Sequence, residues 1–474
     1  MKFPLHATLA SALIATLFAP AVQAEVKLPK VFGDHMVLQQ KTDAAIWGWA
    51  DAGEEVTVTL GDAKATAKAN EDGKWMTKIA TPAAGGPLEL TVKGTNEIVL
   101  KDVLVGEVWL ASGQSNMEWT VDRSLNPADE AKAANYPQIR MIKVAKNPSE
   151  KEVEDIQGEW KICTPENVPA FSACGYFFAR ELHKELGVPV GIINSSWGGT
   201  ICEAWACREA LEKDPDFKPI LDRAATFKPG NPNQAAVLFN GMIHPLVPYG
   251  IKGAIWYQGE SNHSRAAQYA KLFPAMIADW REHFAQGDFP FLFVQLAPYQ
   301  YGMEDPRILA ECWEAQTKTL AVKNTGMAVT TDIGDVKDIH PKNKQEVGRR
   351  LALWALAKTY GKQDLVHSGP LYDSQAIEGN KIRLKFEHVG GGLVAEEGKP
   401  LSHFQIAGED QEFVDATATI DGDTVVVTSD KVAKPVAVRF GWNKTAEPNF
   451  FNKAGLPASP FRTDDFPLLT KDAK

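Results

Sequence analysis

Residues 106–119 read GEVWLASGQSNMEW, a stretch that passes from an apolar strand into a polar turn. Its first half, Glu107–Ser112, has the pattern of a short buried strand. The pattern breaks at Gly113, which leaves Gln114–Asn116 together at the end of the strand. A buried strand that delivers a serine into a polar turn is one way in which a fold presents a nucleophile. Ser115 is therefore a candidate nucleophile, although a lone turn serine more often caps a helix.

Downstream of this stretch, short apolar strands alternate with helical segments as far as about residue 365. Near-continuous apolar strands separated by helices are typical of a parallel sheet covered on both faces. We therefore predict a three-layer α/β/α domain over residues 105–365, in which Pro274 kinks or restarts one helix. The predicted strands are 107–112, 190–194, 252–257, 291–296 and 327–331, and the predicted helices are 174–186, 266–284 and one that begins near Pro341.

The segments on either side of this domain show the period-two alternation of β-strands. It occurs upstream at 55–60, 88–93 and 97–101, and downstream at 381–386, 424–428 and 436–440, with glycine-containing turns between strands. Strands at such spacing predict one small β-sandwich over residues 25–104 and a second over residues 366–474.

The first 24 residues have the pattern of a secretory signal peptide. Lys2 gives a positive start, an apolar run follows over about residues 7–22, and Val22–Ala24 suits signal peptidase. We therefore expect an exported protein, periplasmic or extracellular, that is not inserted in a membrane after cleavage. The formal net charge of −10 argues against nucleic acid or an anionic membrane as the main partner.

The chain has five cysteines, so at least one thiol stays unpaired if disulfides form. Cys163 with Cys174, and Cys202 with Cys207, are the possible local pairs. No cysteine spacing resembles a zinc site. The cysteines therefore indicate no zinc ion, and we expect no other cofactor.

Polar loops follow each predicted strand of the central sheet, and they read SGQSN, SSWGGT, QGESN, APYQY and DIGD. In parallel sheets the site lies at the carboxyl ends of the strands, so these loops are expected to converge. His340 follows the last of these strands and is the best-placed general base for Ser115. A metal site made of Asp335, Asp338 and His340 is an alternative that no other ligand pattern supports.

Donors for an oxyanion are present at two other strand ends. Backbone N–H groups of Gly198 and Gly199 can approach a ligand closely, and the side-chain amide of Asn262 follows the next strand. Each feature also has a plain structural explanation as a turn. Their position after consecutive strands favours the catalytic interpretation.

Four blocks of the sequence, GQSNMEW, SSWGGT, WYQGESN and DIHPKNK, resemble those of the SGNH hydrolase superfamily. More narrowly, these blocks and the segment GLPASPFRTDDF are similar to the sialate O-acetylesterase family. The resemblance implies removal of O-acetyl groups from a sugar through an acetyl-serine intermediate, without metal. It also implies that Ser115 is the nucleophile, that its own N–H joins Gly199 (or Gly198) and Asn262 in the oxyanion hole, and that His340 is the base.

The third member of the triad is where the chain departs from the superfamily pattern. The superfamily has an aspartate three residues before the histidine, and this chain has Lys337 there. Asp338 lies two residues before His340 and Asp335 lies five before it. We favour Asp338 as the acid; Asp335, or a Ser–His dyad held by a backbone carbonyl, are the alternatives.

Several residues near these blocks are candidates for contact with the substrate. Aromatic rings stack on sugar faces, which suggests Trp119 and Trp205, whereas Trp256 is expected in the core. Gln114, Gln258 and Glu260 are polar candidates, and Glu260 either binds a sugar hydroxyl or supports its loop.

The sequence leaves the substrate open between acetylated sialic acid and an acetylated plant glycan such as xylan. Two other classes of function compete with the esterase. A glycosidase would use Glu260 and Asp338 as its acid pair, and a non-catalytic protein would bind carbohydrate through the sandwiches.

Overall fold

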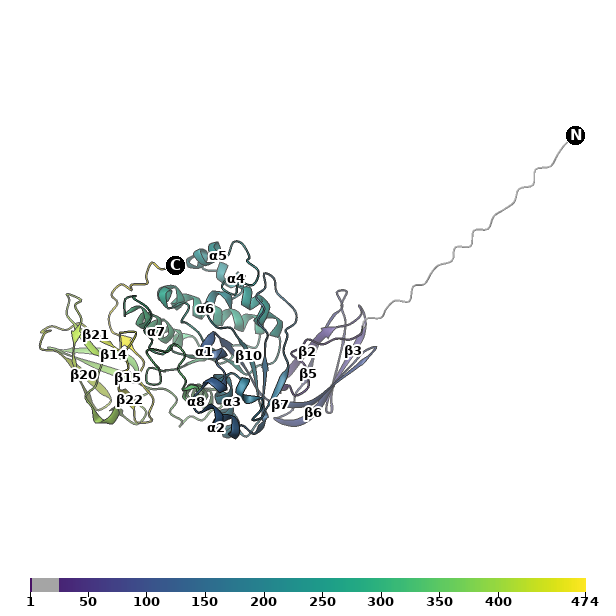
Figure 1. Cartoon of the computed structure of the whole chain (residues 1–474), viewed down its shortest axis with the longest axis horizontal. Helices are drawn as coiled ribbons and strands as arrows, with labels where there is room; N and C mark the ends of the chain where they lie inside the picture. Colours follow the sequence, from purple (N-terminus) through teal and green to yellow (C-terminus); the bar gives the residue numbers. More distant parts are fainter. Residues whose placement is uncertain (2–24) are drawn as a thin grey trace.

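The computed structural model describes Met1 and residues 25–474, so the predicted signal peptide lies outside the described residues apart from Met1. A mostly parallel sheet forms the centre of the molecule (Figure 1). Its strands run in the order β13 (Thr325–Ala328), β12 (Phe291–Val294), β11 (Gly253–Tyr257), β7 (Glu97–Gly113), β10 (Val190–Ser196), β8 (Tyr136–Lys143) and β9 (Trp160–Cys163). All neighbours in this order are parallel except β8 and β9, which are antiparallel.

Helices cover both faces of this sheet, which confirms the predicted three-layer α/β/α fold (Figure 1). On one side α3 (Ala173–Leu186) packs against α8 (Lys344–Trp354), and on the other α6 (Ala266–Phe284) packs against α7 (Ile308–Lys318). The shorter helices are α1 (Ser115–Glu118), α2 (Pro127–Ala133), α4 (Arg208–Glu212) and α5 (Lys218–Arg223). No described helix is long and apolar enough to cross a membrane.

Strand β7 joins the N-terminal β-structure to the central sheet. Its first half pairs with β6, and its second half lies between β10 and β11. The predicted domain boundary at residue 104 therefore falls inside one continuous strand, and both regions share a single hydrophobic core. The other N-terminal strands are β1 (Val37–Gln39), β2 (Asp43–Trp49), β3 (Glu55–Leu60), β4 (Ala63–Lys68), β5 (Lys74–Ala80) and β6 (Gly85–Lys93).

The C-terminal β-structure has a hydrophobic core of its own, which includes Ile382, Val427 and Phe440. One sheet has the order β14 (Leu371–Glu378), β15 (Lys381–Glu387), β20 (Thr424–Thr428) and β19 (Thr417–Asp421). The second has the order β18 (Val414–Asp415), β17 (Phe404–Ala407), β21 (Ala437–Phe440) and β23 (Phe461–Arg462), and β16 (Leu393–Ala395) pairs with β22 (Phe450–Asn452).

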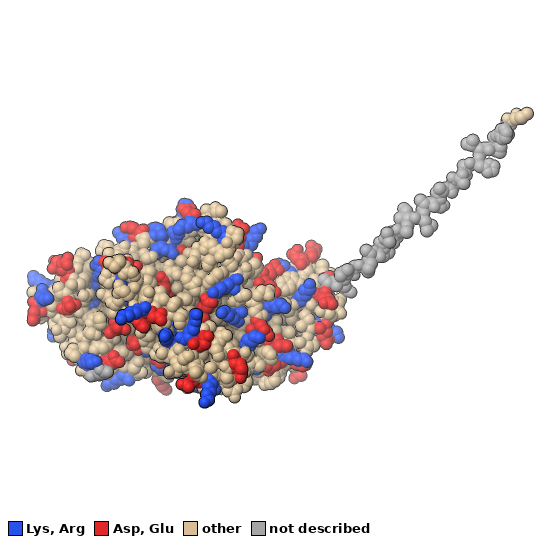
Figure 2. Space-filling model, in the orientation of Figure 1, with Lys and Arg blue, Asp and Glu red and all other residues tan. Residues whose placement is uncertain are grey.

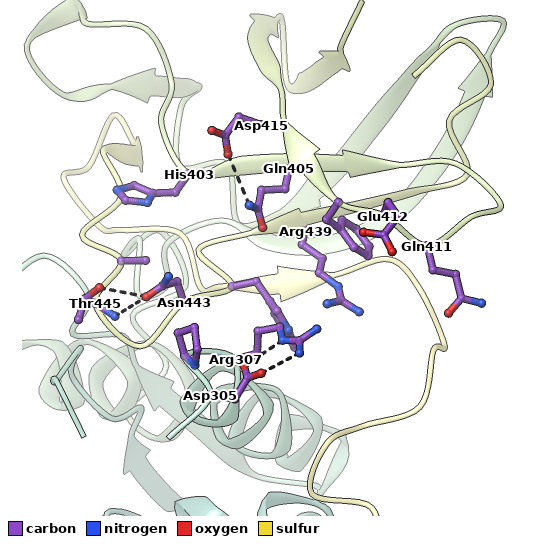
Figure 3. A pocket seen from close by; sticks show the side chains of 14 residues that line it. Asp305, Arg307, His403, Gln405, Gln411, Glu412, Asp415, Arg439, Asn443 and Thr445 are labelled. Atoms are coloured by element: carbon purple, nitrogen blue, oxygen red, sulfur yellow. Dashed lines mark hydrogen bonds and ion pairs between the residues drawn. The ribbon is translucent and has the colours of Figure 1, made fainter. Parts of the chain in front are cut away.

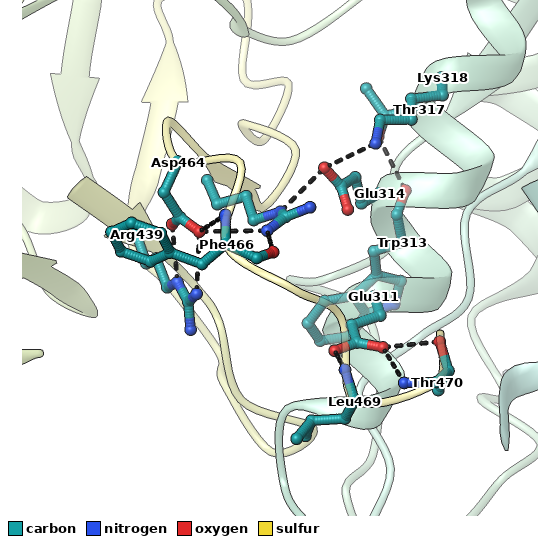
Figure 4. A network of polar contacts seen from close by, with 11 residues as sticks. Glu311, Trp313, Glu314, Thr317, Lys318, Arg439, Asp464, Phe466, Leu469 and Thr470 are labelled. Carbon is teal, nitrogen blue, oxygen red and sulfur yellow. Dashed lines mark hydrogen bonds and ion pairs between the residues drawn. The ribbon is translucent and has the colours of Figure 1, made fainter. Parts of the chain in front are cut away.

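The C-terminal tail ties this β-structure back to helix α7 through buried polar contacts (Figure 4). Arg462 pairs with Glu314 of α7, and Thr470 donates to Glu311 one turn earlier in that helix. Asp464 accepts two hydrogen bonds from Arg439 of β21. The tail therefore fixes the C-terminal sandwich against the α/β layer.

Some elements differ from the sequence-based expectation. Helix α6 continues through Pro274 and does not restart there, and α8 begins at Lys344 rather than near Pro341. Strands β8 and β9 and helix α7 are not among the elements predicted from the sequence, although Leu309, Cys312 and Trp313 of α7 have helical spacing. The five cysteines are free and buried, so neither of the two possible local pairs is bonded in the structure.

Acidic and basic side chains are interspersed over the face of the molecule seen in Figure 2. Neither sign gathers there into one large patch.

Candidate active site

Ser115 lies at the carboxyl end of β7, in the first turn of α1. The turn is held on both sides by neighbouring strands. The backbone N–H of Gln114 donates to the carbonyl of Tyr257 at 2.9 Å, and that of Trp197 donates to the carbonyl of Gly113 at 3.0 Å. Gly113 has φ +133°, and a Cβ there would lie 2.2 Å from the Tyr257 carbonyl oxygen. Only glycine fits at this point, which explains why the apolar strand ends there.

His340 reaches Ser115 from the loop between β13 and α8. Its Nε2 lies 2.8 Å from the hydroxyl oxygen of Ser115, within hydrogen-bond distance. The imidazole also stacks on the indole of Trp119, with 4.5 Å between ring centroids and 16° between planes. The structure thus brings together the predicted nucleophile and base, which are 225 residues apart in the sequence.

The surroundings of His340 favour its neutral form. Burial lowers the pKa of the imidazole below its ordinary value, and the positive charges of Lys344 and Arg123 lower it further. Asp338 acts in the opposite direction and raises it. The net shift is downward, so His340 stays able to accept a proton from Ser115 at mildly acidic pH.

Asp338, the predicted acid, does not bond to the imidazole. Its carboxylate oxygen lies 3.8 Å from His340 Nδ1, beyond hydrogen-bond distance, and accepts the backbone N–H of His340 at 2.9 Å instead. Asp335 accepts the backbone N–H of Lys337 and so stabilises its own turn. Neither carboxylate stands in the position of a hydrogen-bonded triad acid.

The predicted donors to the oxyanion differ in whether their N–H groups already donate a hydrogen bond within the protein. The N–H of Ser115 is in the first turn of α1, where backbone donors have no helical acceptor. The N–H of Gly198 donates to Glu118 at 2.8 Å, whereas that of Gly199, which has φ +75°, has no acceptor among the described residues. Asn262 is buried, and its amide donates one hydrogen bond to Glu203 and keeps a second hydrogen. The geometry therefore favours Gly199 over Gly198.

A buried polar layer beneath Ser115 contains one residue that the sequence singles out, Glu260, and two that it does not, Asn116 and Lys344. It consists of Asn116, Glu260 and Lys344, which come from three different segments of the chain. The Asn116 amide nitrogen donates to Glu260 at 2.5 Å, and the Asn116 amide oxygen accepts from Lys344. The only sequence signal was their place inside the blocks GQSN, QGESN and DIHPKNK.

Most of the predicted substrate contacts are buried. Trp205 is fully enclosed, its indole N–H donates to Thr200, and it packs edge-on against the ring of Trp256. Gln258 is also fully buried, with its amide bonded to Asn262 and to the Thr200 carbonyl. The prediction that Trp205 and Gln258 touch the substrate is therefore wrong, because both side chains are used in packing the loops.

Gln114 and Glu260 likewise point into the protein. The side-chain oxygen of Gln114 accepts the backbone N–H groups of Gly259 and Ser261, and one oxygen of Glu260 accepts from Asn116. Both residues support the loops and are not presented to a sugar in this structure. Trp119, which is partly exposed beside His340, keeps its place as a candidate contact.

Two cavities are relevant to where a substrate binds. One of about 350 Å³ is lined by His340 together with Asp335, Asp338 and Leu125. A larger one, of about 570 Å³, lies between the Asp305–Arg307 turn and the C-terminal sandwich and contains none of the predicted site residues (Figure 3). Of these two cavities, the smaller is the one that His340 lines, and Ser115 lines neither.

Asp335, Asp338 and His340 do not bring three ligand atoms together, so the alternative metal site is not supported. Within the described part of the chain, one group of side chains has the spacing of metal ligands, and it consists of Cys207, Asp279 and His283. There Asp279 already accepts the Cys207 backbone N–H and pairs with His283. This group therefore has a structural explanation.

Known proteins are similar to this chain over most of its length. Residues 105–357 match a family described as carbohydrate esterase, sialic acid-specific acetylesterase. Sialate O-acetylesterase from Rattus norvegicus is 35% identical over 402 residues, covering 71% of this chain and 74% of the relative. The enzyme from Homo sapiens is 32% identical over 476 residues, covering 90% of each chain. A crystal structure described as a novel carbohydrate acetylesterase from Xanthomonas citri is 42% identical, with a TM-score of 0.87, covering 93% of this chain and 100% of that one.

Proposed function

The chain belongs to the family of sialic acid-specific carbohydrate acetylesterases, and from this premise we propose that it deacetylates O-acetylated sialic acid with Ser115 and His340. Carbohydrate O-acetylesterase activity follows from the family and its relatives. The observation that carries the proposed mechanism is the 2.8 Å contact between Ser115 and His340 at the carboxyl edge of the sheet.

The proposed reaction has two half-reactions. Ser115 attacks the acetyl carbonyl carbon while His340 Nε2 takes the hydroxyl proton. The oxyanion is stabilised by the N–H groups of Ser115 and Gly199 and by Asn262. The ester C–O bond then breaks, His340 returns the proton to the sugar oxygen, and acetyl-Ser115 remains. Water attacks this ester with His340 again as base, which releases acetate and restores Ser115.

The side chain of Arg123 is the feature that favours sialic acid as the substrate. It is exposed, and its guanidinium lies 5.0 Å from the centroid of the Trp119 ring, whose indole also stacks on His340. The guanidinium forms no ion pair with any described residue, so it is available for the carboxylate of an anionic sugar. A neutral acetylated glycan, such as acetylxylan, is the second candidate, because Asp335 and Asp338 line the cavity beside His340 and disfavour an anion there.

Acetate release from O-acetylated sialic acids and from acetylated xylan tests the choice of sugar. We expect a higher kcat/KM on the sialic acids, and Arg123→Met should lower it on them by about tenfold without changing hydrolysis of p-nitrophenyl acetate. A preference for xylan that persists in Arg123→Met would support the neutral glycan.

Two competing classes of function have less support. A glycosidase with Glu260 and Asp338 as its acid pair requires both carboxyl groups at the substrate, and Glu260 is buried with one oxygen bonded to Asn116. A purely carbohydrate-binding protein would have no need for the Ser115–His340 pair.

We also propose that the protein is exported, because its first 24 residues have the charge, apolar run and cleavage motif of a signal peptide. N-terminal sequencing of the protein from its native host should begin at Glu25. Recovery of the chain with residues 1–24 intact would contradict export by this route.

A further inference from the structure

The side chain of Asn116 links the neighbours of both reacting residues. Asn116 directly follows Ser115, and Ile339 directly precedes His340. The Asn116 amide nitrogen donates to the Ile339 carbonyl at 3.0 Å. Because Asp338 does not bond to the imidazole, this contact connects the serine turn to the histidine loop where a triad acid would otherwise help to orient the base.

The orientation of the Asn116 amide is determined by the groups on either side of it. Its nitrogen faces the Glu260 carboxylate and its oxygen faces the Lys344 ammonium. A flipped amide would place oxygen against carboxylate and nitrogen against ammonium. The two charge-assisted hydrogen bonds therefore hold the nitrogen toward Ile339.

Lys344 and Glu260 are buried, although charged side chains are rarely enclosed. Burial lowers the pKa of Lys344 to about 8 and raises the pKa of Glu260. The ammonium lies 5.0 Å from the centroid of the Tyr257 ring, which partly replaces its lost hydration. One oxygen of Glu260 has no hydrogen-bond partner among the described residues. Two buried groups of opposite charge, joined here through the Asn116 amide, add little stability compared with an apolar core, which suggests a functional role.

We propose that Lys344, Asn116 and Glu260 form a buried positioning unit that aligns His340 with Ser115, and that the positive charge of Lys344 keeps His340 in its proton-accepting form. The charged groups that act on the imidazole are Asp338 from its own loop, Arg123 and Lys344. Of these, Lys344 alone is fully enclosed, so water screens its charge least. The proposal rests on the Ser115–His340 mechanism and does not depend on which sugar is bound.

The test is the pH dependence of kcat/KM on p-nitrophenyl acetate for Lys344→Met, which keeps the length of the side chain and removes its charge. Without that charge the imidazole of His340 binds a proton more readily. The acidic limb of the profile, where kcat/KM falls as His340 is protonated, should therefore move to higher pH by about 0.5 unit or more. The matched control is Lys342→Met, which removes an exposed ammonium two residues away and should move the limb by less than about 0.2 unit.

A second pair of variants tests positioning. Glu260→Gln keeps an oxygen that can accept from Asn116, whereas Glu260→Ala leaves a buried N–H without a partner. We expect Glu260→Ala to lose about 100-fold in kcat with little change in KM, and Glu260→Gln to retain most of the activity. If Lys344→Met does not fold, Lys344→Gln, which keeps a donor for Asn116, takes its place.

If the acidic limb of the pH profile of kcat/KM is the same in a folded Lys344 variant as in the wild type, the proposed effect of the Lys344 charge on His340 is wrong. Equal activities of Glu260→Ala and Glu260→Gln would overturn the positioning role. Ser115→Ala separates this proposal from the mechanism it rests on. If Ser115→Ala is active, the serine mechanism itself is wrong. If Ser115→Ala is inactive and the acidic limb of the pH profile of the Lys344 variant does not move, only the present inference is wrong.

Discussion

The Nδ1 atom of His340 and the nearest carboxylate oxygen of Asp338 are 3.8 Å apart, so the proposed base of this esterase has a carboxylate neighbour without a hydrogen bond to it. Asp338 uses that oxygen to accept the backbone N–H of His340. Its influence on the imidazole is therefore electrostatic, and it also shapes the loop.

Replacing Asp338 with Asn should consequently have a modest effect. We expect kcat/KM on p-nitrophenyl acetate to fall by less than about tenfold, whereas loss of a hydrogen-bonded triad acid costs about 10⁴-fold. The negative charge of Asp338 raises the pKa of His340, so the acidic limb of Asp338→Asn should move to lower pH. A loss of three orders of magnitude would assign Asp338 the full role of a triad acid. Asp335→Asn is the matched control.

The wild-type enzyme should keep its activity to unusually low pH. His340 must be neutral to accept a proton, and activity is lost as pH falls through its pKa. Burial and the charges of Lys344 and Arg123 hold that pKa below the ordinary value of 6.5. The midpoint of the acidic limb of kcat/KM should therefore lie below pH 6.5. A midpoint above this value would contradict the predicted environment of the imidazole.

The strand end before the nucleophile should tolerate no side chain. Ala at Gly113 would place a methyl group 2.2 Å from the Tyr257 carbonyl oxygen, on a backbone with φ +133°. We expect Gly113→Ala to lower the free energy of unfolding by about 3 kcal/mol or more and to abolish activity. Gly187 also has a positive φ, of +67°, but a methyl group there meets nothing within 4 Å. Gly187→Ala should cost about 1 kcal/mol with unchanged kcat, as measured by denaturant unfolding and esterase assay.

The strand-end rule predicted Ser115 and His340 from the sequence because both follow buried strands of one parallel sheet. It could not predict the polar layer beneath them. Asn116, Glu260 and Lys344 meet only because the turn after β7, the turn after β11 and the start of α8 pack together, and a buried lysine has no sequence signature. The packing of the loops also decides the position of Trp205. The sequence predicts that its ring contacts the substrate, but the loop folds the ring into the core.

The cysteines provide a test of the fold that is independent of catalysis. All five thiols are free and buried, and burial raises the pKa of the Cys174 thiol to about 11. The native protein should therefore react slowly with a thiol reagent such as dithionitrobenzoate, and the denatured protein should expose five thiols without prior reduction. Three or fewer reactive thiols after denaturation would show that a disulfide forms.

The account depends most on Ser115 as the nucleophile. The direct measurement is the rate of p-nitrophenyl acetate hydrolysis by purified Ser115→Ala, with its fold checked by circular dichroism. Because the hydroxyl oxygen of Ser115 is the atom that His340 Nε2 approaches at 2.8 Å, kcat/KM should fall by about 10³-fold or more. Hydrolysis by Ser115→Ala at the wild-type rate would contradict the serine mechanism.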